Sequence, residues 1–180
     1  HIRYYEATTG QDANLAHALD VAGSDPTNRV ISNSWGEPEN ADSRNTFEPI
    51  LATHSASGHT YFFSSGDNAD ETNAVAGATP TPDWPASSPW VTAVGGTSLG
   101  VDASNNRQFE LGWETTRSTL NKTDVTWNTP TWLYGSGGGT SRLFAQPSYQ
   151  AGVVPDSIAK TYGGAAMRVV PDVAAVGDPT

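Results

Sequence analysis

The sequence predicts an α/β fold whose core is a doubly wound, mostly parallel sheet. Three short apolar runs alternate with two longer segments of helical periodicity over residues 1–64. Strands and helices that alternate in this way form βαβ units, which wind right-handed into a parallel sheet covered on both faces. A length of 180 residues fits a single core, and the chain shows no internal repeat, linker or heptad pattern.

The first half of the chain carries the clearest periodicity. Apolar residues at helical spacing indicate two helices, and Gly58 is a suitable C-cap for the second. The expected elements are a strand over 2–7, a helix over 12–22, a strand over 30–34, a helix over 43–57 and a strand over 60–64. This succession of strands and helices is the basis for the predicted parallel sheet.

The second half is less regular. Gly, Pro, Thr and Asn dominate up to Pro89, and a buried strand is then expected over 90–94, ending in Gly95-Gly96-Thr97. Short alternating pieces between 99 and 133, such as 108–113, indicate hairpins at the margin of the sheet. The last expected segments are a glycine-rich loop over 135–139, a helical turn over 147–151 and a segment over 169–176 that contains Pro171-Asp172.

Composition excludes several kinds of protein. The net charge of -10 disfavours nucleic acid as a partner, because a chain this acidic repels the phosphate backbone. No apolar run approaches the roughly 18 residues that span a bilayer, so no membrane partner is expected. Cysteine is absent, so cysteine usage does not indicate whether the protein works in an oxidising or a reducing compartment. No signal-peptide pattern follows His1, so any signal or pro-segment is expected outside this sequence.

Three predicted strands end in small residues and glycine. The segments are Ser34-Trp35-Gly36, Ser64-Ser65-Gly66-Asp67 and Gly95-Gly96-Thr97. Functional groups collect at the carboxyl ends of parallel strands, and glycine there lets an extended peptide approach the backbone. The residues alone also allow a simpler interpretation, in which these segments are only tight strand-to-helix turns.

Other candidate sites are weaker. The glycine-rich run from Gly135 to Ser141 lacks the lysine of a phosphate-binding loop, and Pro147 prevents a long helix after Ser141, which is therefore expected to be a loop residue and not a nucleophile. Packing or surface roles are favoured for His17, His54 and His59. No histidines or carboxylates share one face at ligand spacing, so no metal site is expected in this chain.

Six motifs taken in order resemble the sedolisin family of serine-carboxyl peptidases. They are Ser34-Trp35-Gly36, Ser64-Ser65-Gly66-Asp67, residues 83–91, Val94-Gly95-Gly96-Thr97, residues 137–144 and residues 168–173. The resemblance covers essentially the whole chain and implies a subtilisin-like fold, here as a partial domain. It also implies a catalytic set of Ser, Glu and Asp with a further Asp in the oxyanion hole.

The resemblance assigns site residues by position. Asp67 matches the oxyanion aspartate, and Asp83 lies where some members place an acidic specificity residue. Ser34, Trp35 and Gly36, with Ser64, Ser65 and Gly66, match the two backbone segments that flank the substrate. The implied location is secreted or extracellular, and the implied partners are a peptide or protein substrate and the remainder of the catalytic domain.

The remaining catalytic groups of the family are expected outside residues 1–180. The E-x-x-x-D pair should precede His1, the serine should follow Thr180, and the family's calcium site should lie further toward the C-terminus. Residues 1–180 are thus expected to be the central portion of one catalytic domain, inactive in isolation, with calcium held only by the full-length domain.

Asp67 separates this interpretation from that of a neutral subtilisin-like protease. An ionised carboxylate would repel an oxyanion, so Asp67 can stabilise one only when it is protonated, which requires acid or a raised pKa. A neutral subtilisin-like protease would place asparagine there. The alternatives that stay open are such a neutral protease and a non-catalytic peptide-binding module on the same fold.

Overall fold

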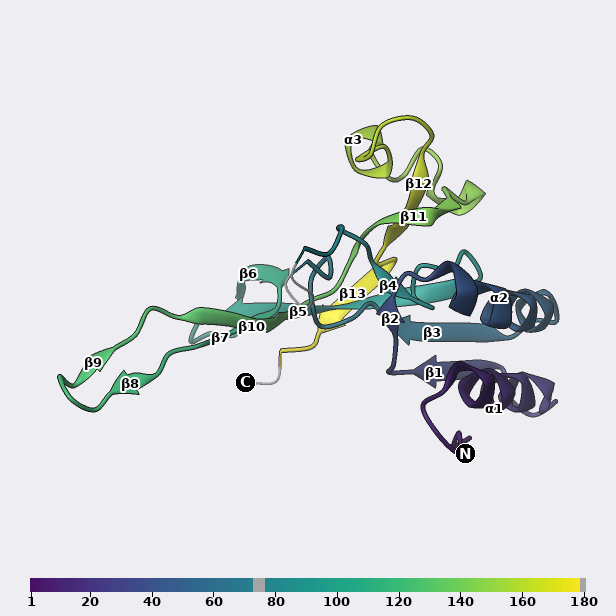
Figure 1. Ribbon diagram of the computed structural model, residues 1–180, viewed down its shortest axis with the longest axis horizontal. Coiled ribbons are helices and arrows are strands. Elements are labelled where there is room, and N and C mark those ends of the chain that lie inside the picture. Colours follow the sequence, from purple (N-terminus) through teal and green to yellow (C-terminus); the bar gives the residue numbers. More distant parts are fainter. Residues whose placement is uncertain (73–76, 179–180) are drawn as a thin grey trace.

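The computed structural model, which describes residues 1–72 and 77–178, contains a five-stranded, mostly parallel central sheet (Figure 1). Its parallel strands are β1 (Val30–Asn33), β3 (Thr60–Ser64), β5 (Val91–Val101) and β13 (Val173–Val176), in that order across the sheet. β6 (Arg107–Gly112) pairs antiparallel with the far end of β5. The predicted α/β fold class is confirmed.

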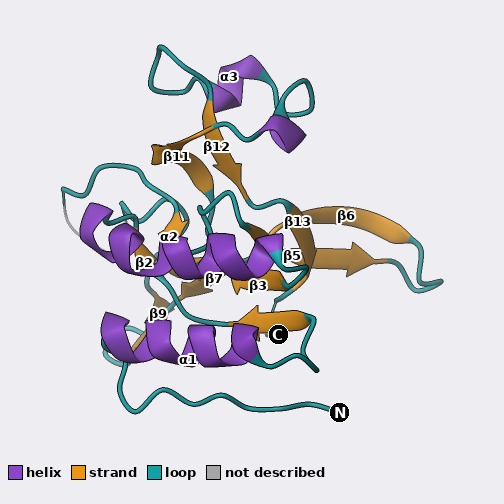
Figure 2. Cartoon of the chain, turned by 90° about the vertical axis from the view of Figure 1, so that its right-hand side faces the viewer, coloured by secondary structure: helices purple, strands orange, loops and turns teal. Residues whose placement is uncertain are grey.

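Two helices lie side by side next to this sheet (Figure 2). They are α1 (Asp12–Ser24) and α2 (Ala41–Ala56), and α1 buries Ala16, Leu19 and Ala22 at the expected helical spacing. Phe47 and Leu51 of α2 pack with Tyr61 and Phe63 of β3 in the main core cluster. Burial of such a continuous apolar face contributes most of the stability of helices this long.

Gly58 ends α2 as predicted. It has a φ of +88°, and the amides of Gly58 and His59 donate to the carbonyls of Ser55 and His54. These two bonds form a Schellman motif, in which a left-handed residue turns the chain out of the helix. The turn leads directly into β3.

The predicted strand over 2–7 is wrong, because this segment pairs with no strand among the residues that the structure describes. The Tyr5 hydroxyl donates to Asp25 at 2.7 Å, while Ile2 and Tyr4 are 87% and 94% exposed. The Ile and Tyr residues of this segment favour a strand, but a strand also needs a neighbour for its backbone groups.

The strand predicted over 90–94 is longer than expected. β5 continues through Gly95 and Gly96 to Val101, because β13 pairs with its middle and β6 with its end. The indole of Trp113 lies where a Cβ on Gly96 would stand, at 2.3 Å. Glycine therefore serves close packing inside this strand and does not end it.

The other described residues form small ribbons, short helices and turns. The elements are β2 (Glu37–Pro38), β4 (Asp83–Trp84), β7 (Glu114–Arg117), β8 (Leu120–Asn121), β9 (Thr126–Trp127), β10 (Thr131–Gly135), β11 (Gly139–Ala145), η1 (Ser148–Gln150), α3 (Asp156–Ala159) and β12 (Met167–Val170). The expected hairpins and the helical turn near Pro147 are confirmed, and Pro171-Asp172 separates β12 from β13. Within the described residues, no helix is both long and apolar enough to cross a membrane.

Candidate active site

The carboxyl ends of β1 and β3 meet a third segment that carries Asp83. β2 follows Gly36 directly and pairs antiparallel with β4, so that Pro38 lies opposite Asp83. A Cβ on Gly36 would lie 3.2 Å from Asp83 Oδ2, and a Cβ on Gly66 would lie 2.3 Å from it. Gly66 also has a φ of +98°. Glycine is thus needed at Gly66 to admit the Asp83 carboxyl group, and at Gly36 it avoids a tight contact with the same group.

The environment of Asp83 is acidic. The side chain is buried, and this burial together with the hydrogen bond and charge of Glu71 raises the pKa of Asp83 to about 8. The charges of Asp67 and Glu37 contribute smaller parts of the same rise in pKa. Asp83 therefore keeps its proton at acid and neutral pH, since like charges and desolvation both oppose the ionised form.

Asp67 lies at the next position after Gly66, with its side chain exposed. Its backbone carbonyl accepts from Gly135 N at 2.7 Å, and the carbonyls of Gly66 and Ala69 accept from Gly137 N and Gly138 N. The predicted glycine-rich loop, which spans the end of β10 to the start of β11, is therefore a wall alongside Asp67. Sequence reasoning missed this partner, although consecutive glycines signal a close backbone approach.

The serines and Trp35 occupy distinct surroundings. Ser65 is buried and its hydroxyl donates to the Gly137 carbonyl at 2.8 Å, so this side chain holds the wall in place. Ser64 is half-buried, whereas Ser34 and Gly36 are exposed. The Trp35 ring packs against Phe47 and Phe63, with centroids 5.6 and 5.2 Å away. Trp35 thus joins the strand end to the core, and its predicted substrate contact stays a prediction.

Ser141 is not a loop residue, contrary to expectation, because it lies within β11 and is fully buried. Its hydroxyl donates to Glu39 Oε1 and accepts from the amides of Leu143 and Phe144. Glu39 Oε2 accepts from Arg142 N at 2.8 Å. Sequence reasoning missed Glu39, which fastens β11 to the chain that follows β2.

The histidines lie away from the strand ends. His54 Nε2 lies 2.9 Å from Asp20 Oδ1 between α2 and α1, and the His54 and His59 rings are both buried. His17 is exposed on α1. Across residues 1–72 and 77–178, no group of three His, Cys, Asp or Glu side chains could hold a metal ion.

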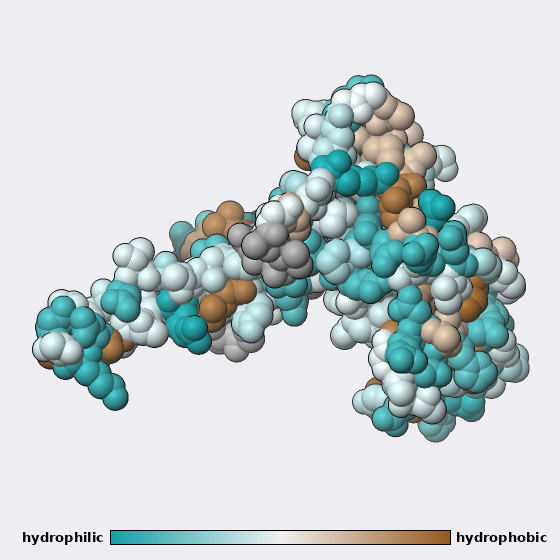
Figure 3. Space-filling view, viewed as in Figure 1, coloured by the Kyte–Doolittle hydropathy of each residue, from teal (hydrophilic) through white to brown (hydrophobic). Residues whose placement is uncertain are grey.

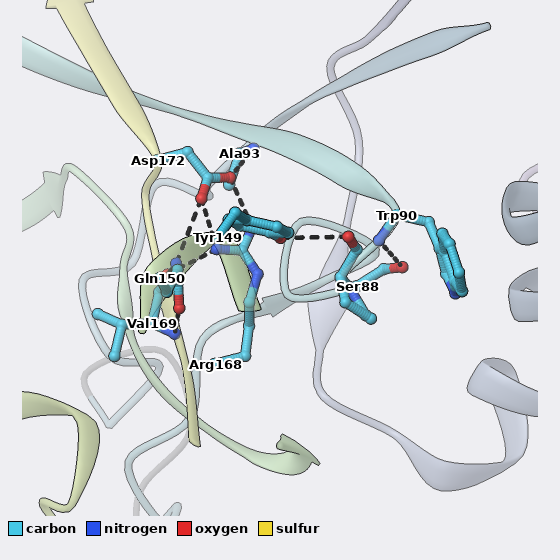
Figure 4. Close-up of polar contacts among 9 residues, drawn as sticks. Ser88, Trp90, Ala93, Tyr149, Gln150, Arg168, Val169 and Asp172 are labelled. Carbon is cyan, nitrogen blue, oxygen red and sulfur yellow. Dashed lines mark hydrogen bonds and ion pairs between the residues drawn. The ribbon is translucent and has the colours of Figure 1, made fainter. Parts of the chain in front are cut away.

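A buried ion pair fixes the entry into β13 (Figure 4). Arg168 is fully buried, and its two terminal nitrogens donate to the two oxygens of Asp172 at 2.5 Å each. Asp172 Oδ2 also accepts from the Ala93 amide of β5, and Gln150 Nε2 reaches Asp172 Oδ1 at 3.3 Å. This network holds the start of β13 against β5.

Comparisons with known proteins agree with this arrangement. The sequence model described as the subtilase family matches residues 2–177. Kumamolisin of Bacillus sp. strain MN-32 is 31% identical over 93% of the chain, and sedolisin of Pseudomonas sp. strain 101 is 32% identical over 94%. Human tripeptidyl-peptidase 1 is 31% identical over 94%. The chain spans only 28% of the length of each of these three relatives.

A solved structure gives the same comparison in three dimensions. Pseudomonas sedolisin, a serine-carboxyl proteinase complexed with two molecules of pseudo-iodotyrostatin, superimposes with a TM-score of 0.71 at 29% identity. The superposition covers 97% of this chain and 45% of that one. The fold of this chain is therefore shared with a known proteinase.

Proposed function

The chain belongs to the subtilase family, as a sedolisin-type member, and from this premise we propose that it is the central part of the catalytic domain of a serine-type endopeptidase that acts at acid pH. The observation that carries the proposal is the position of Asp67, at the carboxyl end of β3 and directly after Gly66. The nucleophilic serine and its Glu and Asp partners would come from the rest of the domain.

The proposed reaction is peptide-bond hydrolysis through an acyl-enzyme. When the serine attacks the scissile carbonyl, negative charge develops on the carbonyl oxygen, and protonated Asp67 donates a hydrogen bond to it. The exposed side chain of Asp67 is accessible to such a substrate. Because the donated proton must be present, the proposed activity belongs to acid pH. The proposed location is secreted or extracellular.

The strand ends supply the proposed walls of the substrate site. Ser34, Trp35 and Gly36 would lie on one side of an extended peptide, and Ser64, Ser65 and Gly66 on the other, where main-chain groups can pair with it. Asp83 lies beneath both glycines and would face a substrate side chain. Since Asp83 holds its proton at acid pH, we propose that at this pH it recognises a substrate side chain by hydrogen bonding more than by charge.

Substitution of Asp67 in the complete protein tests this proposal. Asp67→Ala should lower kcat about a hundred- to a thousandfold with a smaller change in KM, the usual loss for one oxyanion donor. Asp67→Asn should retain more activity and move the alkaline limit of the kcat profile upward, because an amide donates without a titrating proton. Coupling to the other carboxyl groups can make that shift partial.

Asp156→Asn, an exposed carboxyl on α3, is a matched control and should leave kcat unchanged. If Asp67→Ala is as active as the parent, the oxyanion role is wrong. A complete protein that binds peptides without hydrolysing them at any pH would indicate the non-catalytic alternative.

A further inference from the structure

A long two-stranded arm projects from the carboxyl end of the sheet. The arm comprises residues 113–135, with β7 and β10 next to the body and β8 and β9 near the tip. In Figure 1 it extends away from α1 and α2, on the side toward which the arrows of β1 and β3 point. It therefore leaves the molecule on the side of the candidate active site.

One strand of the arm begins at the backbone of Asp67, and the other begins at Gly96 of β5. Gly135 N donates to the Asp67 carbonyl, and Gly135 also forms a parallel bridge with Asn68. On the other strand, Trp113 N donates to Gly96 O at 3.2 Å, and Trp113 O accepts from Ser136 N. The arm is thus continuous with the wall of the proposed substrate site.

The arm exposes apolar side chains and strand edges. Leu120 and Trp127 face each other across β8 and β9 and are 40% and 69% exposed, and Val125 in the intervening turn is 74% exposed. Apolar residues lie along the arm in Figure 3. Apart from the bridge at Gly135, β7 and β10 pair only with each other among the described residues. Such edges and aromatic groups are what an extended polypeptide can bind.

The charge of the arm does not oppose binding of an extended polypeptide. The arm has two acidic and two basic residues, whereas the chain as a whole has a net charge of -10. Glu114 and Asp124 are offset by Arg117 and Lys122. The arm therefore presents apolar and main-chain groups and has no net charge of its own.

We propose that the arm is a second docking surface for protein substrates, contacting parts of an extended polypeptide that lie several residues from the bond being cleaved. The inference rests on the proposed function and names its substrate class as long polypeptides. From Trp113 to Leu120 an extended strand rises about 23 Å, at roughly 3.3 Å per residue. A substrate must therefore continue about seven residues past the arm's root to reach the tip.

The test compares short and long substrates of the complete protein. One peptide has six residues, and two others carry the same cleaved sequence extended by twelve residues at either end. The variants are the double substitution Leu120→Ser with Trp127→Ser and a matched control, Val153→Ser, which changes a 76% exposed apolar residue outside the arm.

The double variant should lower kcat/KM about tenfold on one of the extended peptides, mainly through KM, because exposed aromatic anchors dominate such contacts. The short peptide should be cleaved within twofold of the parent, and Val153→Ser should change neither value. Whether the N-terminally or the C-terminally extended peptide loses kcat/KM shows on which side of the scissile bond the arm contacts the substrate.

Other results overturn the inference. Equal losses on short and long peptides would mean that the arm acts through the position of Asp67, and no loss on either extended peptide would exclude contact. Light scattering that shows the parent as a dimer and the double variant as a monomer would assign the tip to a second copy. If Trp127 is shielded from acrylamide quenching without substrate, the rest of the protein covers the tip. A parent that cleaves none of the peptides overturns the proposed function as well.

Discussion

Replacement of Arg168 by methionine should destabilise the protein strongly. The change keeps a long apolar stem but removes the guanidinium group that donates to both oxygens of Asp172. Arg168 is fully buried and the Asp172 side chain is 17% exposed, so water cannot replace the lost partner effectively. Asp172 would keep only the Ala93 amide and the long contact from Gln150. The buried Asp172 carboxylate without its guanidinium partner is the main cause of the expected loss in the free energy of unfolding.

Breaking a buried ion pair from one side costs about 3 to 5 kcal/mol. Urea unfolding of the complete protein at neutral pH measures the difference from the parent. Lys160→Met is the matched control, because Lys160 also pairs with an aspartate four residues away but in an exposed position. That pair should contribute about 0 to 1 kcal/mol. The double variant Arg168→Met with Asp172→Asn should cost at least about 1 kcal/mol less than the sum of its single substitutions, because no buried charge is left unpaired.

Two results would refute this reasoning. Arg168→Met could prove no more destabilising than Lys160→Met, in which case the network does not hold β13. The double variant could instead lose the full sum of the single effects, and then the unpaired carboxylate would not be the cause.

Trp35→Ala should lower the free energy of unfolding by about 3 kcal/mol through loss of its ring contacts, and Trp35→Phe should restore most of this in urea unfolding; an unchanged midpoint for the alanine variant would exclude a core role. Ser141→Ala in the complete protein should leave kcat within a few-fold, whereas loss of a nucleophile costs about a millionfold, so labelling of Ser141 by an active-site-directed reagent would contradict its placement. Because folding raises the pKa of Asp83 from 3.8 to about 8, the protonated form stabilises the fold below pH 4 and that stabilisation is lost as the pH rises to about 8. The loss should have a slope of at most about 1.4 kcal/mol per pH unit in unfolding experiments, and Asp83→Asn should flatten it; a parent with no such slope would contradict the acidic environment described for Asp83.

Local pattern was sufficient for the elements that are held by their own residues. The helix over 12–22 was predicted from apolar spacing, and Gly58 was placed at the end of α2 because a left-handed turn there favours glycine. Strand 60–64 matches β3 at both ends. Of the three expected strand ends, those at Gly36 and Gly66 meet at one carboxyl group, whereas Gly95-Gly96-Thr97 lies inside β5.

Elements that depend on distant partners were predicted less well. Residues 2–7 contain the Ile and Tyr side chains that strands favour, yet the described residues include no strand that pairs with them. β5 continues past Gly96 because β6 and β13 supply hydrogen-bonding partners, which the local sequence of β5 does not reveal. Ser141 is in a strand for a similar reason, since β12 pairs with β11 and Glu39 receives the serine hydroxyl.

The sequence by itself determined the fold class, the family resemblance and the positions of Asp67 and Asp83, because these depend on residue type and order along the chain. Only the tertiary structure decided that Glu71 lies beside Asp83, that the glycine wall binds the backbone around Asp67, and that Arg168 is buried against Asp172. Except for Arg168 and Asp172, these partners are separated by 12 residues or more. Their contacts depend on how strands and loops pack together in three dimensions. The periodicity within a single segment does not predict that packing.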